Sequence, residues 1–119
     1  MNRVQSSKAV YTAAEVYSGG PELAWRAYGL MGLGTVLSST GAFAECIPVI
    51  EEALALNEKA ERNRNVVYLG NLLLANAYHQ IGCDAKAFQH LSEARANAQN
   101  QNEVEQAEMV EKLISATAE

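Results

Sequence analysis

Apolar residues recur at intervals of three or four along most of the chain, which is the spacing of one face of an α-helix. Between residues 61 and 81, for example, Val66, Leu69, Leu73 and Ala77 share such a face. No stretch alternates apolar and polar residues as a half-buried strand does, so we expect no β-sheet. The predicted helices cover residues 4–17, 21–39, 42–57, 61–81, 84–100 and 103–116.

Glycine and proline mark the ends of these helices. Pro21 opens the second one, because proline at a first helical position loses only a hydrogen bond that was unavailable there anyway. Gly41 and Gly82 follow the second and fourth helices as stops. Asp84 is placed to cap the start of the fifth helix. The pattern therefore predicts an all-α fold of antiparallel helix hairpins.

The two central hairpins repeat each other. When Gly41 is laid over Gly82, Leu33 falls on Leu74, a shift of 41 residues (82 − 41) that holds throughout. Repeated hairpins of this length cannot bury their apolar faces alone and so form a stack. The prediction is one domain over residues 1–119, with repeats over 21–60 and 61–100 and flanking helices over 4–17 and 103–116.

Small and large residues alternate along the predicted contacts between helices. Gly34 and Ala75 are expected opposite Ala53 and Ala94, where two helices approach closely. Larger side chains are expected to fill the space between the hairpins. These are Leu33, Leu37, Ile50, Leu74, Tyr78 and Leu91.

The repeat also carries a motif. Its copies are Leu30-x-x-Leu33-Gly34-x-x-Leu37 with Cys46-x-x-x-Ile50, and Asn71-x-x-Leu74-Ala75-x-x-Tyr78 with Ala87-x-x-x-Leu91. At these residues the chain resembles the tetratricopeptide repeat family, although the family's tryptophan and closing proline are missing. The shift of 41 residues exceeds the usual repeat of about 34 and resembles the extended-repeat variety found in some bacterial regulatory proteins and signalling adaptors.

The resemblance implies a superhelix whose inner wall is formed by the first helix of each hairpin. Such a concave groove binds a peptide or a partner helix, so the expected function is that of a protein-interaction module, as an adaptor or regulatory domain. The alternative is structural self-assembly, in which a second copy covers the apolar ends to give a homodimer. The residues expected to line the groove are Tyr28, Met31, Thr35, Ser38, Leu69, Leu72, Asn76, His79 and Gln80.

Some members of the family grip a terminal carboxylate with lysine, arginine and asparagine from successive first helices. Here only Asn76 matches, while Met31, Gly32, Leu72 and Leu73 stand where the other partners would be expected. The resemblance therefore implies no carboxylate clamp and negligible affinity for acidic C-terminal peptides.

Three glycines, Gly29, Gly32 and Gly34, lie inside the helix predicted over residues 21–39. Each costs about 0.8 to 1 kcal/mol relative to alanine, so close packing against this chain or a partner is expected to compensate. Trp25, Gly29 and Gly32 are therefore a predicted close-contact face for a partner or a second copy. The alternative is that the helix predicted over residues 4–17 covers them.

The charge balance argues against nucleic acid as a partner. Nine Lys and Arg against 14 Asp and Glu give a net charge of −5, whereas phosphate binding needs a cationic surface. No apolar run is long enough to span a membrane, and residues 1–20 lack the apolar core of a signal peptide. We therefore expect a cytoplasmic protein with a protein or peptide partner, and neither nucleic acid nor membrane as partner.

Candidate chemistry is sparse. Cys46 and Cys83 lie far apart without a Cys-x-x-Cys motif, and neither His79 nor His90 has a carboxylate or cysteine at metal-ligand spacing. No pair of nucleophile and base can be proposed from two histidines. We therefore expect no enzyme activity, no catalytic residue, no metal, no cofactor and no small-molecule substrate.

Overall fold

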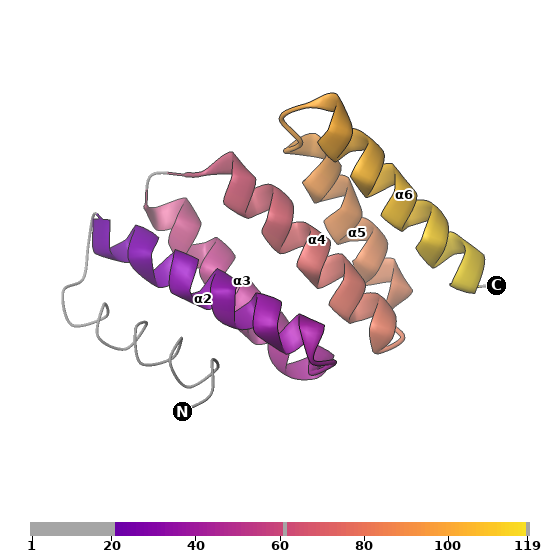
Figure 1. Cartoon of the computed structure of the whole chain (residues 1–119), viewed down its shortest axis with the longest axis horizontal. Coiled ribbons are helices and arrows are strands. Elements are labelled where there is room, and N and C mark those ends of the chain that lie inside the picture. Colours follow the sequence, from indigo (N-terminus) through magenta and orange to yellow (C-terminus); the bar gives the residue numbers. More distant parts are fainter. Residues whose placement is uncertain (1–20, 61, 119) are drawn as a thin grey trace.

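The computed structural model describes residues 21–60 and 62–118, so the helix predicted over residues 4–17 lies outside the described part. The described residues form five α-helices and no strand, which confirms the all-α prediction. The helices are α2 (Pro21–Ser39), α3 (Phe43–Lys59), α4 (Arg64–Gln80), α5 (Asp84–Ala96) and α6 (Gln101–Ala118) (Figure 1).

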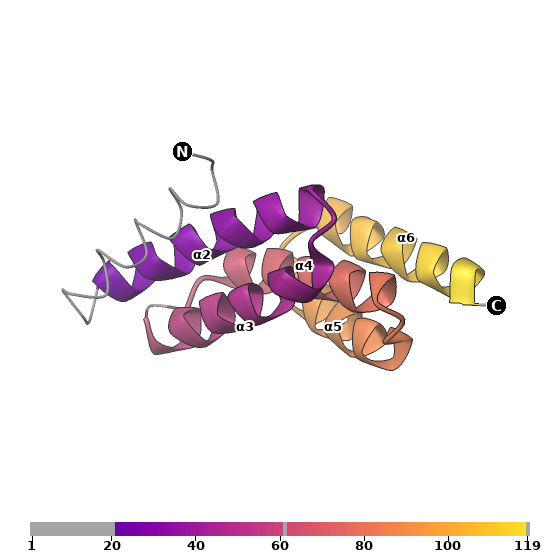
Figure 2. The same ribbon diagram turned by 90° about the horizontal axis from the view of Figure 1, so that it is seen from below.

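The helices are arranged in two layers. Helices α2, α4 and α6 lie in one layer, and α3 and α5 lie in the other (Figure 2). Helix α4 contacts α2, α3 and α5, and α6 packs on α5. Side chains of α4 also bind α6, because the Tyr68 hydroxyl donates to the Gln106 side chain and lies 3.1 Å from the Glu103 carbonyl oxygen. Successive helices are therefore neighbours in space as well as in sequence.

The two hairpins turn in the same way. After α2, Gly41 adopts φ 82°, and after α4, Gly82 adopts φ 85°, a region that favours glycine. In each turn the residue after the glycine donates to a carbonyl five residues earlier, Ala42 to Leu37 and Cys83 to Tyr78, both at 2.8 Å. This is the hydrogen bonding of a Schellman motif. The alignment of Gly41 with Gly82 is thus matched by the local structure.

The core lies between the layers and contains the residues that the pattern predicted. All six large residues expected between the hairpins are buried, and Ala53 and Ala94 are fully buried. The expected partner of Gly34 is wrong in detail, because a Cβ at Gly34 would lie 2.1 Å from Ile50 Cδ1, so the bulky Ile50 faces this glycine. The Cys46 thiol also approaches the Gly34 carbonyl oxygen, at 3.3 Å. A side chain at residue 34 would have to displace the buried Ile50 side chain of α3.

Helix α4 begins at Arg64, later than the predicted residue 61, because Asn63 caps it. The Asn63 Oδ1 accepts from the backbone N–H of Asn65 at 2.9 Å and of Val66 at 3.4 Å. Asn57 holds the backbone of Asn63 from α3, since its side chain donates to the Asn63 carbonyl oxygen and accepts from the Asn63 N–H. An asparagine cap therefore sets this helix start.

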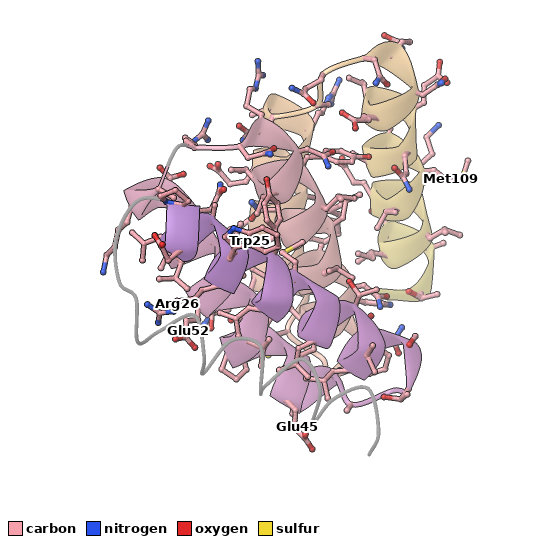
Figure 3. All side chains as sticks on the ribbon, turned by 60° about the vertical axis from the view of Figure 1, so that its left-hand side comes forward. Trp25, Arg26, Glu45, Glu52 and Met109 are labelled. Carbon is pink, nitrogen blue, oxygen red and sulfur yellow. The ribbon has the colours of Figure 1, made fainter. Side chains whose placement is uncertain are left out.

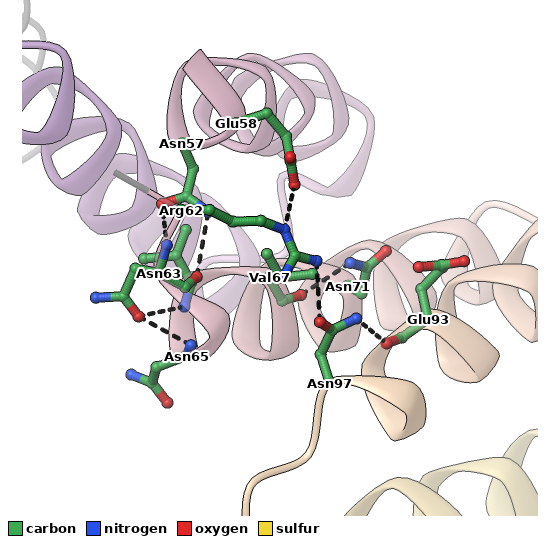
Figure 4. A network of polar contacts seen from close by, with 10 residues as sticks. Asn57, Glu58, Arg62, Asn63, Asn65, Val67, Asn71, Glu93 and Asn97 are labelled. Carbon is green, nitrogen blue, oxygen red and sulfur yellow. Dashed lines mark hydrogen bonds and ion pairs between the residues drawn. The ribbon is translucent and has the colours of Figure 1, made fainter. Parts of the chain in front are cut away.

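Helix α5 ends at Ala96 and not at the predicted residue 100. The Asn97 side chain donates to the Glu93 carbonyl oxygen at 2.8 Å and accepts from the Arg62 guanidinium at 3.0 Å (Figure 4). Arg62 also forms an ion pair with Glu58 on α3 at 2.8 Å. One arginine thus connects the end of α3 with the end of α5.

The predicted cap of α5 is also wrong. Asp84 is the first residue inside α5, and Cys83 precedes it at the cap position without a side-chain hydrogen bond to the helix. The Asp84 carboxylate instead lies 2.7 Å from Nδ1 of His79 at the end of α4. Its position in the first turn still suits the positive end of the α5 dipole.

Candidate interaction surface

Helices α2 and α4 turn a common set of exposed and half-exposed side chains away from the core. Along each helix these residues are spaced three or four apart, opposite the buried positions. We call this surface the neutral face. Its members are Trp25, Tyr28, Gly32 and Thr35 from α2, and Leu69, Leu72, Asn76 and Gln80 from α4.

The neutral face lacks the charged side chains found on the other layer. The sequence contains no Asp, Glu, Lys or Arg over residues 27–44 or over residues 65–83. Figure 3 shows Trp25 on α2 and the acidic Glu45 and Glu52 projecting from α3. An exposed helix face is normally charged or polar, so an uncharged one calls for an explanation. The exposed charged residues of α3 and α5 are Glu45, Glu51, Glu52, Glu58, Lys59, Lys86, Glu93 and Arg95.

The predicted groove residues differ in how far they are exposed. Tyr28 is 50% exposed and Leu69 is 41% exposed, while Thr35 and Gln80 are also exposed. Met31 and Leu72 are half-buried because they pack against the core cluster. The half-buried polar members are Ser38, Asn76 and His79.

The polar groups of this surface bind mostly to other groups of the same chain. The Tyr28 hydroxyl accepts from Asn63 Nδ2 at 3.0 Å, which joins α2 to the cap of α4. The Thr35 hydroxyl donates to the Met31 carbonyl oxygen of its own helix at 2.8 Å. The Asn76 Oδ1 accepts from Gln80 Nε2 at 3.5 Å. These bonds leave further capacity, since the Tyr28 hydroxyl keeps a proton to donate and the Asn76 amide nitrogen is not used in them.

His79 connects three helices at one edge of this surface. Its Nδ1 lies 2.7 Å from Asp84 Oδ1 on α5, and its Nε2 lies 3.0 Å from Thr117 Oγ1 on α6. No sequence pattern predicts this contact, because the stacking of α6 on α5 brings together residues that lie 38 apart in the chain.

The order of carboxylate, imidazole and hydroxyl also occurs in hydrolases. Nucleophilic catalysis further requires donors for a developing oxyanion. The groups beside the Thr117 hydroxyl are the carbonyl oxygens of Leu113 and Ile114, at 3.1 Å and 3.2 Å, which are acceptors. The contact therefore suits the attachment of α6 better than acyl transfer.

The predicted close-contact residues are placed differently from one another. Trp25 is 65% exposed and Gly32 is exposed, whereas Gly29 is half-buried. Among residues 21–60 and 62–118, a Cβ at Gly32 would meet no atom within 4 Å, so packing within this described part gives no reason for a glycine there. Gly34 has the opposite surroundings, since a Cβ there would clash with Ile50. Packing among the described residues therefore explains the glycine at residue 34 but not the one at residue 32.

An aromatic pair lies between α4 and α5, formed by Tyr78 on the inner side of α4 and His90 on α5. The Tyr78 and His90 rings stack with centroids 5.4 Å apart, and His90 Nδ1 lies 2.8 Å from Asn71 Oδ1. Burial lowers the pKa of the His90 imidazole, an effect that the Glu51 and Glu93 carboxylates oppose. Burial also raises the pKa of the Tyr78 hydroxyl, with a further contribution from Glu51.

Other surfaces of the described residues show fewer features of a binding site. Met109 is 62% exposed and lies on the outer side of α6 (Figure 3), and Leu113 on the same helix is 61% exposed. Over residues 21–60 and 62–118, no three His, Cys, Asp or Glu side chains gather in a way that could hold a metal ion. None of the helices in these ranges is long and apolar enough to cross a membrane. A shallow hollow on α5 and α6 is lined by Arg95, Glu108, Glu111, Lys112 and Ser115.

Comparison of the chain with models of protein families, with curated proteins and with solved structures found no match.

Proposed function

We propose that the chain is a stack of helix hairpins like that of the tetratricopeptide repeat proteins, and that it is a protein-interaction module. The observation that carries this proposal is the neutral face, on which the exposed Tyr28 and Leu69 lie among uncharged residues. The other layer of the same small domain is covered by charged side chains. Exposed apolar groups on one surface are typical of sites that bind another protein.

The surroundings of Gly32 support the same function. A glycine inside a helix costs about 0.8 to 1 kcal/mol relative to alanine, and Gly32 is not needed for packing against the residues that the structure describes. A partner that approaches the bare backbone of α2 supplies the missing reason. In this proposal the chain acts as an adaptor or regulatory domain and not as an enzyme, and a cytoplasmic location remains a prediction from the sequence.

Self-assembly is the second candidate, favoured by the exposure of Met109 on the outer side of α6. A second copy that packed there would bury this side chain and Leu113. Four glutamates and one lysine lie on α6, so two copies of this helix would repel each other. Light scattering on the isolated chain measures this candidate directly, since a dimer has twice the mass of the monomer.

The proposed function is tested by affinity capture from the native cell with three forms of the full chain. Leu69→Glu places a charge on the neutral face, and Ala55→Glu places the same charge on an exposed position of α3. We expect the wild type and Ala55→Glu to retain a protein that Leu69→Glu loses, with helicity unchanged in all three forms. Equal capture by all three would show that the neutral face is not the binding site.

A further inference from the structure

We propose that the outer side of α6, where Met109 and Leu113 are exposed, is a stacking face that binds the α2 end of a second copy, so that copies join head to tail. The inference goes beyond the partner binding of the proposed function and states which surfaces of two copies would meet. It rests on the 41-residue repeat, on the exposure of both ends of the described stack, and on their charges.

Helix α6 continues the repeat as the first helix of a further hairpin. A shift of 41 residues (107 − 66) carries Val66 and Leu73 of α4 onto Ala107 and Ile114 of α6. Both α6 residues are buried, as is Val66, while Leu73 is half-buried against the core cluster. This side of α4 faces the preceding hairpin, since a Cβ at Gly70, four residues after Val66, would meet a side chain of α3.

Met109 and Leu113 lie at the positions that face the following hairpin. The same shift places them on Tyr68 and Leu72 of α4. Tyr68 is 1% exposed and its hydroxyl lies 3.1 Å from the Glu103 carbonyl oxygen, so α6 covers this side of α4. No helix of the described residues follows α6, and Met109 and Leu113 are 62% and 61% exposed. Their side of α6 is therefore a stacking face to which no further helix is bound.

The α2 end of the stack is exposed at the matching positions. Helices α2 and α6 lie at opposite ends of the described stack (Figure 1). The shift places Trp25 on Val66 and Gly32 on Leu73, which in α4 face the preceding hairpin. Among residues 21–60 and 62–118, Trp25 is 65% exposed and Gly32 is exposed. A contact between α6 of one copy and α2 of the next would therefore repeat the contacts that α4 makes with its two neighbours in the same layer.

The charges favour this contact over one between two α6 helices. Helix α6 carries four glutamates and one lysine, so two such helices repel each other. Residues 1–39 carry two acidic and three basic residues, which are Glu15, Glu22, Arg3, Lys8 and Arg26. The α2 end is thus weakly positive and would meet an acidic helix, which favours one orientation of the two copies. Because the two faces differ, each joined copy keeps a free end to which another can bind.

The mass of the full chain at increasing concentration tests the inference, by light scattering and sedimentation. We expect the mass to rise with concentration beyond that of a dimer, because the contact is heterologous. Leu113→Glu and Trp25→Glu should each weaken association at least about tenfold, since each buries a charge in the contact. Ala55→Glu, which adds the same charge to an exposed position of α3, should leave association unchanged. Thermal melting checks that all variants fold.

A mixture of Leu113→Glu and Trp25→Glu tests the head-to-tail arrangement. Each variant keeps one intact face, so the two should be monomers alone and form a dimer, but nothing larger, when mixed. If α6 instead bound α6 of a second copy, Trp25→Glu alone would still dimerise. That result would overturn the inference.

The remaining outcomes separate this inference from the proposed function. A monomer at every concentration overturns the inference. So does a Trp25→Glu variant that melts at a lower temperature with unchanged association, because Trp25 then packs within its own chain. Neither result affects the proposed function, which depends on a partner whose capture Leu69→Glu abolishes. Leu69→Glu should leave self-association unchanged, because Leu69 lies on neither of the two joined faces; its loss in this variant would place the contact on the neutral face and overturn the head-to-tail joint.

Discussion

Gly34 and Gly32 lie on the inner and outer sides of the same helix, and only the inner one is explained by packing. At Gly34, an added Cβ would clash with Ile50 Cδ1, so a side chain here would have to displace the fully buried Ile50 side chain. At Gly32, an added Cβ would meet no atom of the described residues within 4 Å. Glycine thus lies at a close contact between helices at residue 34 and beside an unfilled space at residue 32.

Helix α4 shows the same contrast with leucine. Leu74 is fully buried against the other helices, whereas Leu69 is 41% exposed on the neutral face. Burial in the core accounts for the apolar side chain of Leu74 on the inner side. It does not account for the exposed part of the Leu69 side chain on the outer side. Residues that the fold itself does not need are therefore the ones that indicate a function.

The largest expected effect separates the two leucines. Leu74→Ala should lower the free energy of unfolding by about 2 to 5 kcal/mol, because it leaves a cavity in the core. Leu69→Ala should cost only about 1 kcal/mol or less, because much of its side chain is already in water. Urea denaturation of both variants measures the difference. Equal losses would show that Leu69 belongs to the core and not to an exposed surface.

The next effect tests the inner side of α2. Gly34→Ala should lower the free energy of unfolding by about 1 to 2 kcal/mol, because overpacking against the fully buried Ile50 outweighs the gain in helix propensity. The double variant Gly34→Ala with Ile50→Val, compared with Ile50→Val alone, is the control. The cost of the alanine should fall when the facing side chain is shortened, and an unchanged cost would place the strain elsewhere.

The sequence allowed much of the inner side to be predicted. Pro21 and Gly41 bracket α2, and the observed bounds agree with the predicted ones at both ends. The buried leucines follow from the helical period and from the repeat. These features depend on residues close together in the chain, which is why a single sequence is enough to find them.

Other features depend on contacts between distant residues and could not be predicted in this way. The early end of α5 involves Asn97 and Arg62, and the attachment of α6 involves His79 and Thr117. The neutral face could be predicted from the sequence only in part. Its members could be selected by spacing, but the open space at Gly32 and the paired state of its polar groups required the neighbouring helices.

Gly32→Ala should have the opposite sign to Gly34→Ala. We expect the free energy of unfolding to rise by about 0.5 to 1 kcal/mol, because alanine favours the helix and no atom lies within 4 Å of its Cβ. Thermal and urea denaturation, run beside Gly34→Ala, measure the two signs. A destabilised Gly32→Ala would mean that this position is packed within the chain. The open space at Gly32 would then no longer support the neutral face as a binding surface.

The smallest effect is a dependence on pH that comes from His90 of α5, which packs against the inner side of α4. Burial lowers the pKa of His90 below its ordinary value of 6.5, so the unfolded chain binds more protons than the folded chain between the two pKa values. The free energy of unfolding should therefore fall as the pH falls through this window. His90→Gln removes the titrating group and keeps an amide that can donate to Asn71 Oδ1, the present partner of the ring.

The measurement is the melting temperature of both forms between about pH 7.5 and 5.5, above the range in which most carboxylates titrate. The wild type should lose more stability over this range than His90→Gln, whose absolute stability is lower because the stacking with Tyr78 is gone. Parallel curves would mean that His90 titrates alike in the folded and unfolded chains. The contact between α4 and α5 would then be open to water at His90, and the contrast between buried and exposed sides would not extend to this contact.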